Sequence, residues 1–219
     1  MGDKIELAKY FKLMKEYPQE FVNTGSLHIV TDKKVIREYV RNTGNRIGVL
    51  YESPYHMMVV DLVYNQPGEY FAYERLFPFD SGVGVVCVPR YKGKYIILRQ
   101  YRHAMRDFQY AFPRGYGEDG ILGIENATKE LREEIGAKLS SQDLLGRVIP
   151  DSGLCGNSVE IYLCEIEGYE KKTGYEDIVD VLELSFEELT NMVATKQITD
   201  GFTLSAYSLL IAKQLEGEE

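Results

Sequence analysis

The sequence has no long hydrophobic run and no uncharged leader. No stretch of 18 or more apolar residues occurs among its 219 residues, and the opening MGDKIELAKYFK is charged from its third residue. Neither a membrane span nor a secretory signal peptide is predicted. The chain begins with Met-Gly, but Glu6 stands where a myristoylation signal has serine or threonine. We therefore expect a soluble, cytoplasmic protein with no membrane partner.

Cysteine and histidine are also scarce. The chain has three of each, with no CxxC spacing. An odd number of scattered cysteines argues against a disulfide framework, and so few scattered ligands argue against a zinc site. We expect the cysteines to be small packing residues in a reducing compartment. These residues are Cys87, Cys155, Cys164, His28, His56 and His103.

Positive charge is outnumbered. There are 25 lysines and arginines against 34 acidic residues, which gives a formal net charge of −9. Phosphate backbones are held by clustered cations, so no nucleic-acid partner is predicted. An anionic small substrate would need a local basic patch, and the segment 99–114 offers one. It contains Arg99, Arg102, His103, Arg106 and Arg114, opposed only by Asp107.

With 44% apolar residues, the chain is long enough for one large domain or two small ones. Residues 1–20 have helical apolar spacing, and a second helix is expected between Asp32 as N-cap and Gly44. A short strand, LHIV, lies between them. From 46 to 113, apolar and aromatic runs separated by Gly, Pro and Asn predict a series of β-strands.

The second half of the chain alternates helices and strands. A helix is predicted over 124–135, ending at Gly136. Another begins at Ser185, which forms a capping box with Glu188, and a closing helix is capped at Thr199 or Asp200. Strands are expected in GRVIP, SVEIYLCEI and DIVDVLEL. Strands interrupted by at least three helices imply a mixed α+β or layered α/β/α fold.

The helix over 124–135 carries three glutamates on one face. At 100° per residue, Glu133 and Glu134 lie on either side of Glu130, apart from an apolar stripe that would be buried. A solvated polar face explains this arrangement in part, but Glu130 and Glu134 are a like-charge i,i+4 pair that costs about 0.2–0.5 kcal/mol. Magnesium prefers oxygen ligands and completes its shell with water and phosphates. A magnesium site on this face therefore competes with the solvated-face interpretation.

The surrounding stretch FPRGYGEDGILGIENATKELREEIGA resembles the Nudix hydrolase signature. Its glycine, its three helix glutamates and its closing glycine are in register, with Leu131 and Ala137 at the aliphatic positions. Two positions depart, because Ile121 replaces the first signature glutamate and Lys129 replaces its arginine. We expect these two exchanges to affect a pair that supports the loop more than they affect metal capture. The matching positions are Gly115, Glu130, Leu131, Glu133, Glu134, Gly136 and Ala137.

Outside the signature, YIILRQYRHAM and PDSGLCGNSVEIYLCEI resemble the ADP-ribose pyrophosphatase branch, over roughly 46–215. The resemblance implies an α+β fold, a Nudix-type α/β/α sandwich with a mixed β-sheet. We expect N-terminal helices in 1–45, a β-rich segment in 46–80 and the Nudix domain in 81–219. In that branch the β-rich segment pairs across a homodimer, so a homodimer is expected.

The resemblance also implies roles for individual residues. Magnesium, or manganese in its place, would be held by Glu130, Glu134, Glu133 and the backbone carbonyl of Arg114, with Glu118 a weaker candidate. Glu133 could instead orient water. The general base would come from an acidic residue after the signature, for which Glu160, Glu170 and Glu176 compete. The diphosphate would be bound by Arg99, Arg102 and Arg114, and a base would stack on Tyr51, Tyr55 or Phe108.

The resulting prediction is a magnesium-dependent pyrophosphatase that hydrolyses ADP-ribose, or a related nucleoside diphosphate sugar, to a nucleoside monophosphate and a sugar phosphate. A Nudix enzyme for a different nucleotide sugar or a dinucleotide is the alternative within enzymes. The alternative from another class is a Nudix-fold module that senses a nucleotide without catalysis. Ile121 and Lys129 favour the sensor, whereas the complete set of helix glutamates favours the enzyme.

Overall fold

The computed structural model describes residues 2–66, 68–78 and 82–216 and divides into two compact units. The first unit comprises residues 1–79 together with 151–157, and the second comprises 80–150 together with 158–219. Each unit has its own hydrophobic core. No helix in the described part of the chain is long and apolar enough to cross a membrane.

The first unit is a four-stranded antiparallel sheet packed against helices. The helices of this unit lie close to the predicted ranges 1–20 and 32–44. The second helix is bounded as expected, since Asp32 accepts hydrogen bonds from two backbone N–H groups and Gly44 adopts the left-handed conformation. The helical residues share one core with the strands. The elements are α1 (Gly2–Glu16), η1 (Pro18–Phe21), β1 (His28–Ile29), α2 (Lys33–Thr43), β2 (Gly48–Glu52), β3 (Met57–Tyr64) and β4 (Tyr70–Leu76).

The second unit is a seven-stranded mixed sheet with helices on both faces. The α+β, Nudix-type α/β/α prediction is confirmed. The strands are β5 (Gly84–Tyr91), β6 (Lys94–Arg102), β7 (Asp107–Ala111), β8 (Arg114–Gly115), β9 (Lys138–Val148), β10 (Val159–Gly168) and β11 (Ile178–Leu184). The helices are α3 (Gly123–Ile135), η2 (Tyr175–Asp177), α4 (Phe186–Ala194) and α5 (Gly201–Glu216).

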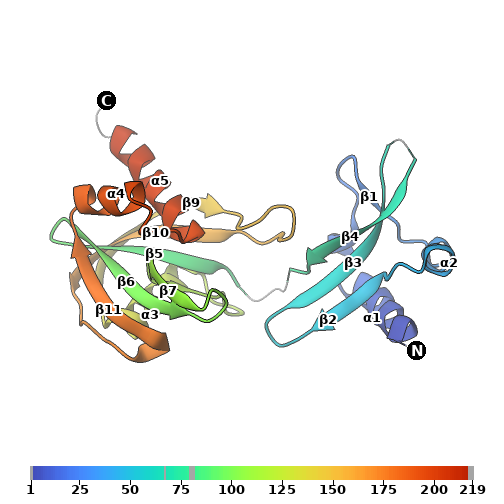
Figure 1. The fold of residues 1–219 in the computed structure, drawn as a ribbon, viewed down its shortest axis with the longest axis horizontal. Coiled ribbons are helices and arrows are strands. Elements are labelled where there is room, and N and C mark those ends of the chain that lie inside the picture. Colours follow the sequence, from blue (N-terminus) through green and yellow to red (C-terminus); the bar gives the residue numbers. More distant parts are fainter. Residues whose placement is uncertain (1, 67, 79–81, 217–219) are drawn as a thin grey trace. The chain divides into compact units, whose positions relative to one another are not determined.

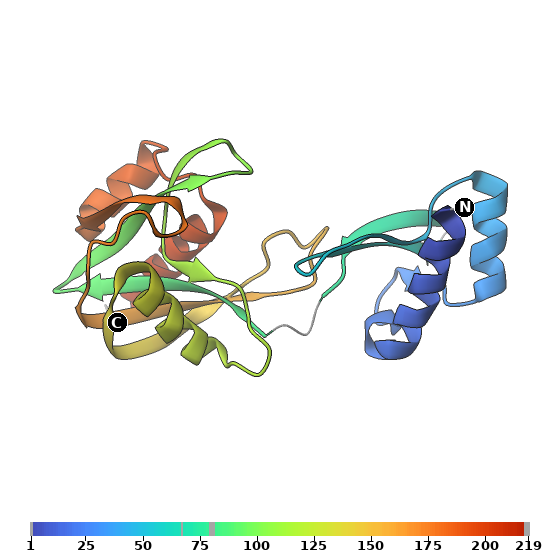
Figure 2. The same ribbon diagram turned by 90° about the horizontal axis from the view of Figure 1, so that it is seen from below.

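Side chains of the central strand β5 alternate between the two faces of the sheet and so belong to two different cores. Val86 and Val88 face a core shared with α4 and α5, whereas Val85 and Cys87 face a core shared with α3. Figures 1 and 2 show α3 on one face of this sheet and the pair α4 and α5 on the other. β5 pairs in parallel with β10, and its end continues through a hairpin into β6. This arrangement places the acidic helix directly over the centre of the sheet.

Candidate active site on the acidic helix

Helix α3 sits on the sheet through an apolar stripe, and one of its glutamates is buried beside that stripe. Ala127, Leu131 and Ile135 are fully buried in the core that α3 shares with the sheet. Gly136 ends the helix in the left-handed conformation, as expected. Glu134 is only 2% exposed, whereas Glu130 and Glu133 are partly exposed. The three carboxylates therefore share one side of the helix at different depths.

The buried carboxylate of Glu134 is not fully hydrogen-bonded. Its Oε2 atom has no hydrogen-bond partner. Burial, followed by the charges of Glu130 and Glu176, raises the pKa of this carboxyl from 4.5 to about 8, against the opposing effect of Arg102 and of a hydrogen bond from the Arg114 backbone. A buried carboxyl with a free oxygen beside other acids is typical of a functional site rather than of a stabilising contact.

Glu130 lies above the loop that precedes α3. The Glu130 carboxylate lies directly against Gly115, and a Cβ atom at that position would displace it. Burial raises the pKa of Glu130, and the neighbouring charges of Glu133 and Glu176 raise it further, against Lys129. Glu133 itself has a cation nearby, since its Oε2 lies 3.8 Å from Lys129 Nζ. Of the neighbouring acids, Glu130 is the one whose charge acts most strongly on Glu134.

Of the three candidates for the general base, the structure brings Glu176 to the acidic helix. Its charge acts on both Glu130 and Glu134. Glu176 and the following Asp177 have positive φ angles of 45° and 61°. Gln100 Nε2, from a side chain that is only 3% exposed, donates to the Glu176 carbonyl at 2.7 Å. Two consecutive left-handed, non-glycine residues cost of order 1–3 kcal/mol each, so the surrounding contacts must hold this turn.

Glu160 and Glu170 lie elsewhere. Glu160 is buried beside Gly123 at the start of α3, about two helical turns before Glu130. Although burial acts to raise its pKa, hydrogen bonds from Tyr162 and Arg147 hold that pKa below its ordinary value. Glu170 lies beside Gly136 at the far end of the helix, and its side chain is 71% exposed. Neither is grouped with the helix glutamates, so of the three candidates Glu176 is the one that lies near Glu130 and Glu134.

Two of the predicted arginines lie near the acidic cluster, Arg102 through its side chain and Arg114 through its backbone. Arg102 is half-buried, and its Nε atom has no hydrogen-bond partner. Burial and the charge of Arg114 lower its pKa, whereas Asp200, Glu134 and Glu176 raise it. Arg114 donates from Nη1 to Asp200 Oδ1 at 2.7 Å. Arg114 is thus paired with Asp200, whereas the Arg102 Nε–H is left as a donor for an anionic ligand.

Arg102 and Arg114 line a cavity of about 540 Å³. Its wall includes the start of α5, where Asp200 Oδ2 accepts from the Thr203 backbone and hydroxyl, and the ring of Phe202, over which Arg114 lies at 5.1 Å. The cavity size is within the usual range for small-molecule sites. Sequence reasoning identified Asp200 only as a helix cap, because its contact with Arg114 joins residues 86 positions apart.

The third predicted arginine, Arg99, lies beside an aromatic ring. Its guanidinium carbon is 4.6 Å from the centroid of Phe108. Tyr51 and Tyr55, the other stacking candidates, are highly exposed residues of the first unit. Among the three candidates, Phe108 is the one that lines a cavity near the acidic helix.

The residues of this site suit a magnesium-type ion. The donor set is entirely oxygen, and the unpartnered buried Oε2 of Glu134 is an open ligand position. Cys87 N–H donates to the Pro113 carbonyl, so the next pair along the two antiparallel strands, Val86 and Arg114, is a non-hydrogen-bonded pair. The N–H and C=O groups of Arg114 therefore point away from β5. Within the described ranges no three acidic, cysteine or histidine side chains form a ready-made metal cluster. Two carboxylates and a carbonyl would thus need water and phosphate to complete the shell.

Comparison with known proteins agrees with this fold. No protein-family model matches the chain. It is similar to an ADP-ribose pyrophosphatase of Bacillus subtilis, 23% identical over 126 residues that cover 56% of this chain and 68% of that protein. A crystal structure of an ADP compounds hydrolase superposes with a TM-score of 0.68, at 17% identity, over 78% of this chain and 91% of the other. The chain has a Nudix, ADP-ribose pyrophosphatase-like fold.

A second relative of this Nudix-fold protein has a different name. A methanol dehydrogenase activator of Bacillus methanolicus is 24% identical over 135 residues, which cover 59% of this chain and 71% of that protein. Both relatives match the chain at a similar level of identity. Proteins named for different activities therefore match this chain equally well.

The departures from the Nudix signature have a structural counterpart. Lys129, which replaces the signature arginine, forms an ion pair with Glu118 in the loop between Gly115 and α3. Ile121, which replaces the first signature glutamate, hydrogen-bonds through its backbone N–H to the Glu118 carbonyl at 3.1 Å. Glu118, three residues before Ile121, thus ties the loop to the helix through Lys129. This contact also occupies Glu118, the weaker metal-ligand candidate.

Replacing Lys129 with methionine is expected to have a small effect. The ion pair with Glu118 is partly exposed, so its loss should lower the free energy of unfolding by about 0.2–1 kcal/mol and should reduce kcat less than tenfold. Urea denaturation and steady-state kinetics measure both. Lys172→Met, which removes the exposed pair with Glu170, is the control. A total loss of turnover in Lys129→Met would show that Lys129 acts directly in the reaction.

Proposed function

We propose that this Nudix-fold protein is a magnesium-dependent pyrophosphatase that acts on ADP-ribose or a related nucleoside diphosphate sugar. The observation that carries the proposal is the buried Glu134 carboxylate, whose Oε2 has no partner, near Glu130, Glu176 and Arg102. Acids and a cation arranged around one space suit a substrate that brings negative phosphates together with a divalent ion. The similarity to proteins named ADP-ribose pyrophosphatase and ADP compounds hydrolase supports a Nudix-type hydrolase.

Each side chain has a role in binding. Glu130 and Glu134 would hold the ion together with the Arg114 carbonyl, and manganese could replace magnesium. When bound, the ion neutralises phosphoryl charge and lowers the pKa of water. Arg102 and Arg114 donate hydrogen bonds to the non-bridging phosphate oxygens. Asp200 holds the Arg114 guanidinium in place, so this cation is positioned before substrate arrives.

Hydrolysis requires a water oxygen in line with the bridging oxygen of the diphosphate. Glu176 accepts the proton of that water while the new phosphorus–oxygen bond forms. The bond from the same phosphorus to the bridging oxygen breaks, and its electron pair leaves with the second phosphate. One water is consumed, and the products are a nucleoside monophosphate and a sugar phosphate. Glu133, partly paired with Lys129, orients the water or adds a metal ligand.

The test is incubation of the protein with ADP-ribose and magnesium, followed by chromatography for AMP and ribose 5-phosphate. We expect turnover that is lost with a chelator and restored by magnesium or manganese. A panel of other nucleotide sugars and dinucleotides identifies the preferred substrate. Tight nucleotide binding without turnover on the whole panel would contradict the enzyme and favour the nucleotide-sensing module.

We also propose that the chain forms a homodimer through the β-rich segment 46–80. Three tyrosines of this segment, Tyr51, Tyr55 and Tyr70, are exposed by 47–76%. Tyrosine is enriched in interfaces between subunits. Light scattering should give about twice the chain mass of 25.1 kDa. A mass equal to that of a single chain would exclude the dimer.

A further inference from the structure

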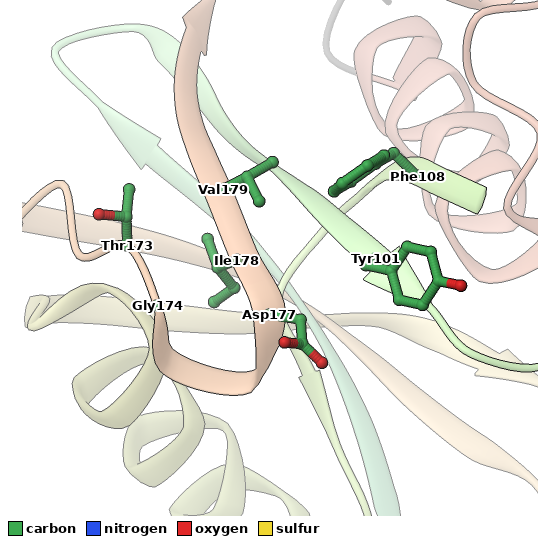
Figure 3. Close-up of a pocket in the computed structure, with 7 residues that line it drawn as sticks. All are labelled: Tyr101, Phe108, Thr173, Gly174, Asp177, Ile178 and Val179. Carbon is green, nitrogen blue, oxygen red and sulfur yellow. The ribbon is translucent and has the colours of Figure 1, made fainter. Parts of the chain in front are cut away.

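A second cavity of the second unit lies on the other side of the turn that carries Glu176. It is an open slot of about 490 Å³ between the β6–β7 hairpin and the segment that leads into β11. Figure 3 shows Tyr101 and Phe108 on one side of the slot and Ile178 and Val179 on the other. This volume is within the usual range for small-molecule sites. The helix glutamates and the two arginines of the acidic site do not line it.

One wall of the slot is a rigid aromatic ring. Phe108 is 41% exposed, yet its ring is fixed by two neighbours. Arg99 lies over it at 4.6 Å, and the Tyr101 ring, directly across the β6–β7 pair, meets it edge-on at 5.4 Å. A partly exposed ring that is already held in place loses little entropy when a flat ligand stacks on it. Phe108 is therefore suited to hold a planar group.

The opposite wall is made by a β-bulge. The pairing of β11 with β6 passes from Ile178 opposite Gln100 to Asp180 opposite Arg99, so Val179 has no partner. Bulges turn a side chain away from its regular direction. Val179 is 43% exposed, and Figure 3 shows it pointing toward Phe108. The slot thus has an apolar side chain on one wall and an aromatic ring on the other.

The third side of the slot joins it to the acidic site. Asp177 lines the slot, whereas the preceding Glu176 belongs to the acidic cluster. Their two left-handed backbone conformations are held by the Gln100 bond to the Glu176 carbonyl and by the Gly174 N–H bond to the Ile178 carbonyl at 2.7 Å. The turn thus presents one carboxylate to each site. In the chain, Asp177 stands between Glu176 of the acidic cluster and Ile178 and Val179 of the slot wall.

That order matches a ribonucleoside attached to a diphosphate. A carboxylate repels phosphate but accepts hydrogen bonds from hydroxyl groups, so the group beside Asp177 should be the ribose. The group beyond it, between Phe108 and Val179, should be flat and apolar on its faces, as a nucleobase is. We propose that this slot binds the ribonucleoside arm of the substrate, with Phe108 stacking on the base and Asp177 recognising the ribose hydroxyls. The inference rests on the proposed function in placing the diphosphate at the acidic helix.

The test is binding of AMP and 2′-deoxy-AMP, measured by calorimetry without turnover. We expect Phe108→Ala to weaken AMP binding about tenfold or more, because base stacking on an aromatic side chain is lost. Phe108→Tyr should restore it. Wild type should prefer AMP to 2′-deoxy-AMP, and Asp177→Ala should remove that preference. Leu144→Ala, which truncates an exposed apolar side chain outside the slot, is the control.

The result separates this inference from the proposed function. Loss of AMP binding in Phe108→Ala without any hydrolysis of ADP-ribose by wild type would support the slot and refute the enzyme. Normal hydrolysis with unchanged AMP affinity in Phe108→Ala and unchanged ribose preference in Asp177→Ala would refute the slot and leave the enzyme. An equal weakening of AMP binding in Leu144→Ala would also refute it. Equal thermal unfolding of Phe108→Ala, Asp177→Ala and wild type shows that the slot variants fold.

Discussion

Replacing Glu134 with glutamine is expected to reduce kcat by about three orders of magnitude or more. The variant keeps the shape of the side chain but removes the charge that would attract a divalent ion. A loss of roughly 4 kcal/mol of transition-state stabilisation corresponds to this factor, and metal ions supply several kcal/mol in phosphoryl transfer. Steady-state kinetics with the preferred substrate and saturating magnesium measure it. Turnover within tenfold of wild type would show that Glu134 is not a metal ligand.

The same substitution should stabilise the fold at alkaline pH when no divalent ion is present. The pKa of Glu134 is raised from 4.5 to about 8, so between these values the folded chain binds more protons than the unfolded chain. The free energy of unfolding of wild type therefore falls as pH rises from 4.5 to 8, by at most about 3–5 kcal/mol from this group. Glutamine cannot ionise, so the variant should not show this fall.

Urea denaturation at pH 5 and pH 9 in the presence of a chelator measures the effect. Wild type and Glu134→Gln should be close in stability at pH 5, and the variant should be more stable at pH 9. Glu133→Gln, which removes a more exposed carboxylate one residue earlier, is the matched control and should follow wild type. Equal pH dependence of wild type and Glu134→Gln would contradict the assignment of a raised pKa to Glu134.

Replacing Glu176 with glutamine should lower kcat by about 10²–10⁴-fold, the usual contribution of a general base. KM should change much less, because Glu176 contacts the attacking water rather than the substrate. Glutamine keeps the backbone contacts of the turn, including the hydrogen bond from Gln100 to the carbonyl of residue 176. The loss should therefore reflect proton transfer rather than a displaced loop.

Glu170→Gln is the control for this prediction. Glu170 also follows the Nudix signature, but its side chain is 71% exposed and lies beside Gly136. We expect its kcat to equal that of wild type. A loss of kcat in Glu170→Gln as large as in Glu176→Gln would contradict the assignment of the base. Glu160→Gln is less informative, because it also breaks the contacts with Arg147 and Tyr162.

Much of the fold could be predicted because local rules and the hydrophobic pattern agree. Asp32 and Gly44 bound α2 through cap interactions, and Ser185 with Glu188 forms the expected capping box of α4. The strand β9 begins at Lys138, well before the predicted strand GRVIP. Its first half, KLSSQD, was not predicted because it is polar and lacks alternation. That half is a strand because it pairs with β10. Pairing over such distances along the chain is not visible in local sequence.

The site could be predicted only where one helix contains it. Glu130, Glu133 and Glu134 share a face because helical geometry places them there. The choice among Glu160, Glu170 and Glu176 depends on where β10 and the turn before β11 run, and spacing does not reveal that. The same holds for Lys129, whose partner is Glu118 rather than the residue at 121. Contacts between elements, rather than residue types, decide these roles.

Crystals grown with manganese and a non-hydrolysable analogue of ADP-ribose test the central claim most directly. The claim is that a divalent ion shared with phosphate oxygens offsets the repulsion among the acids of α3. Anomalous scattering should show manganese bound by Glu130 and Glu134, with the analogue's phosphates completing its shell. An analogue bound with no manganese at these glutamates, or manganese bound only elsewhere, would contradict the account.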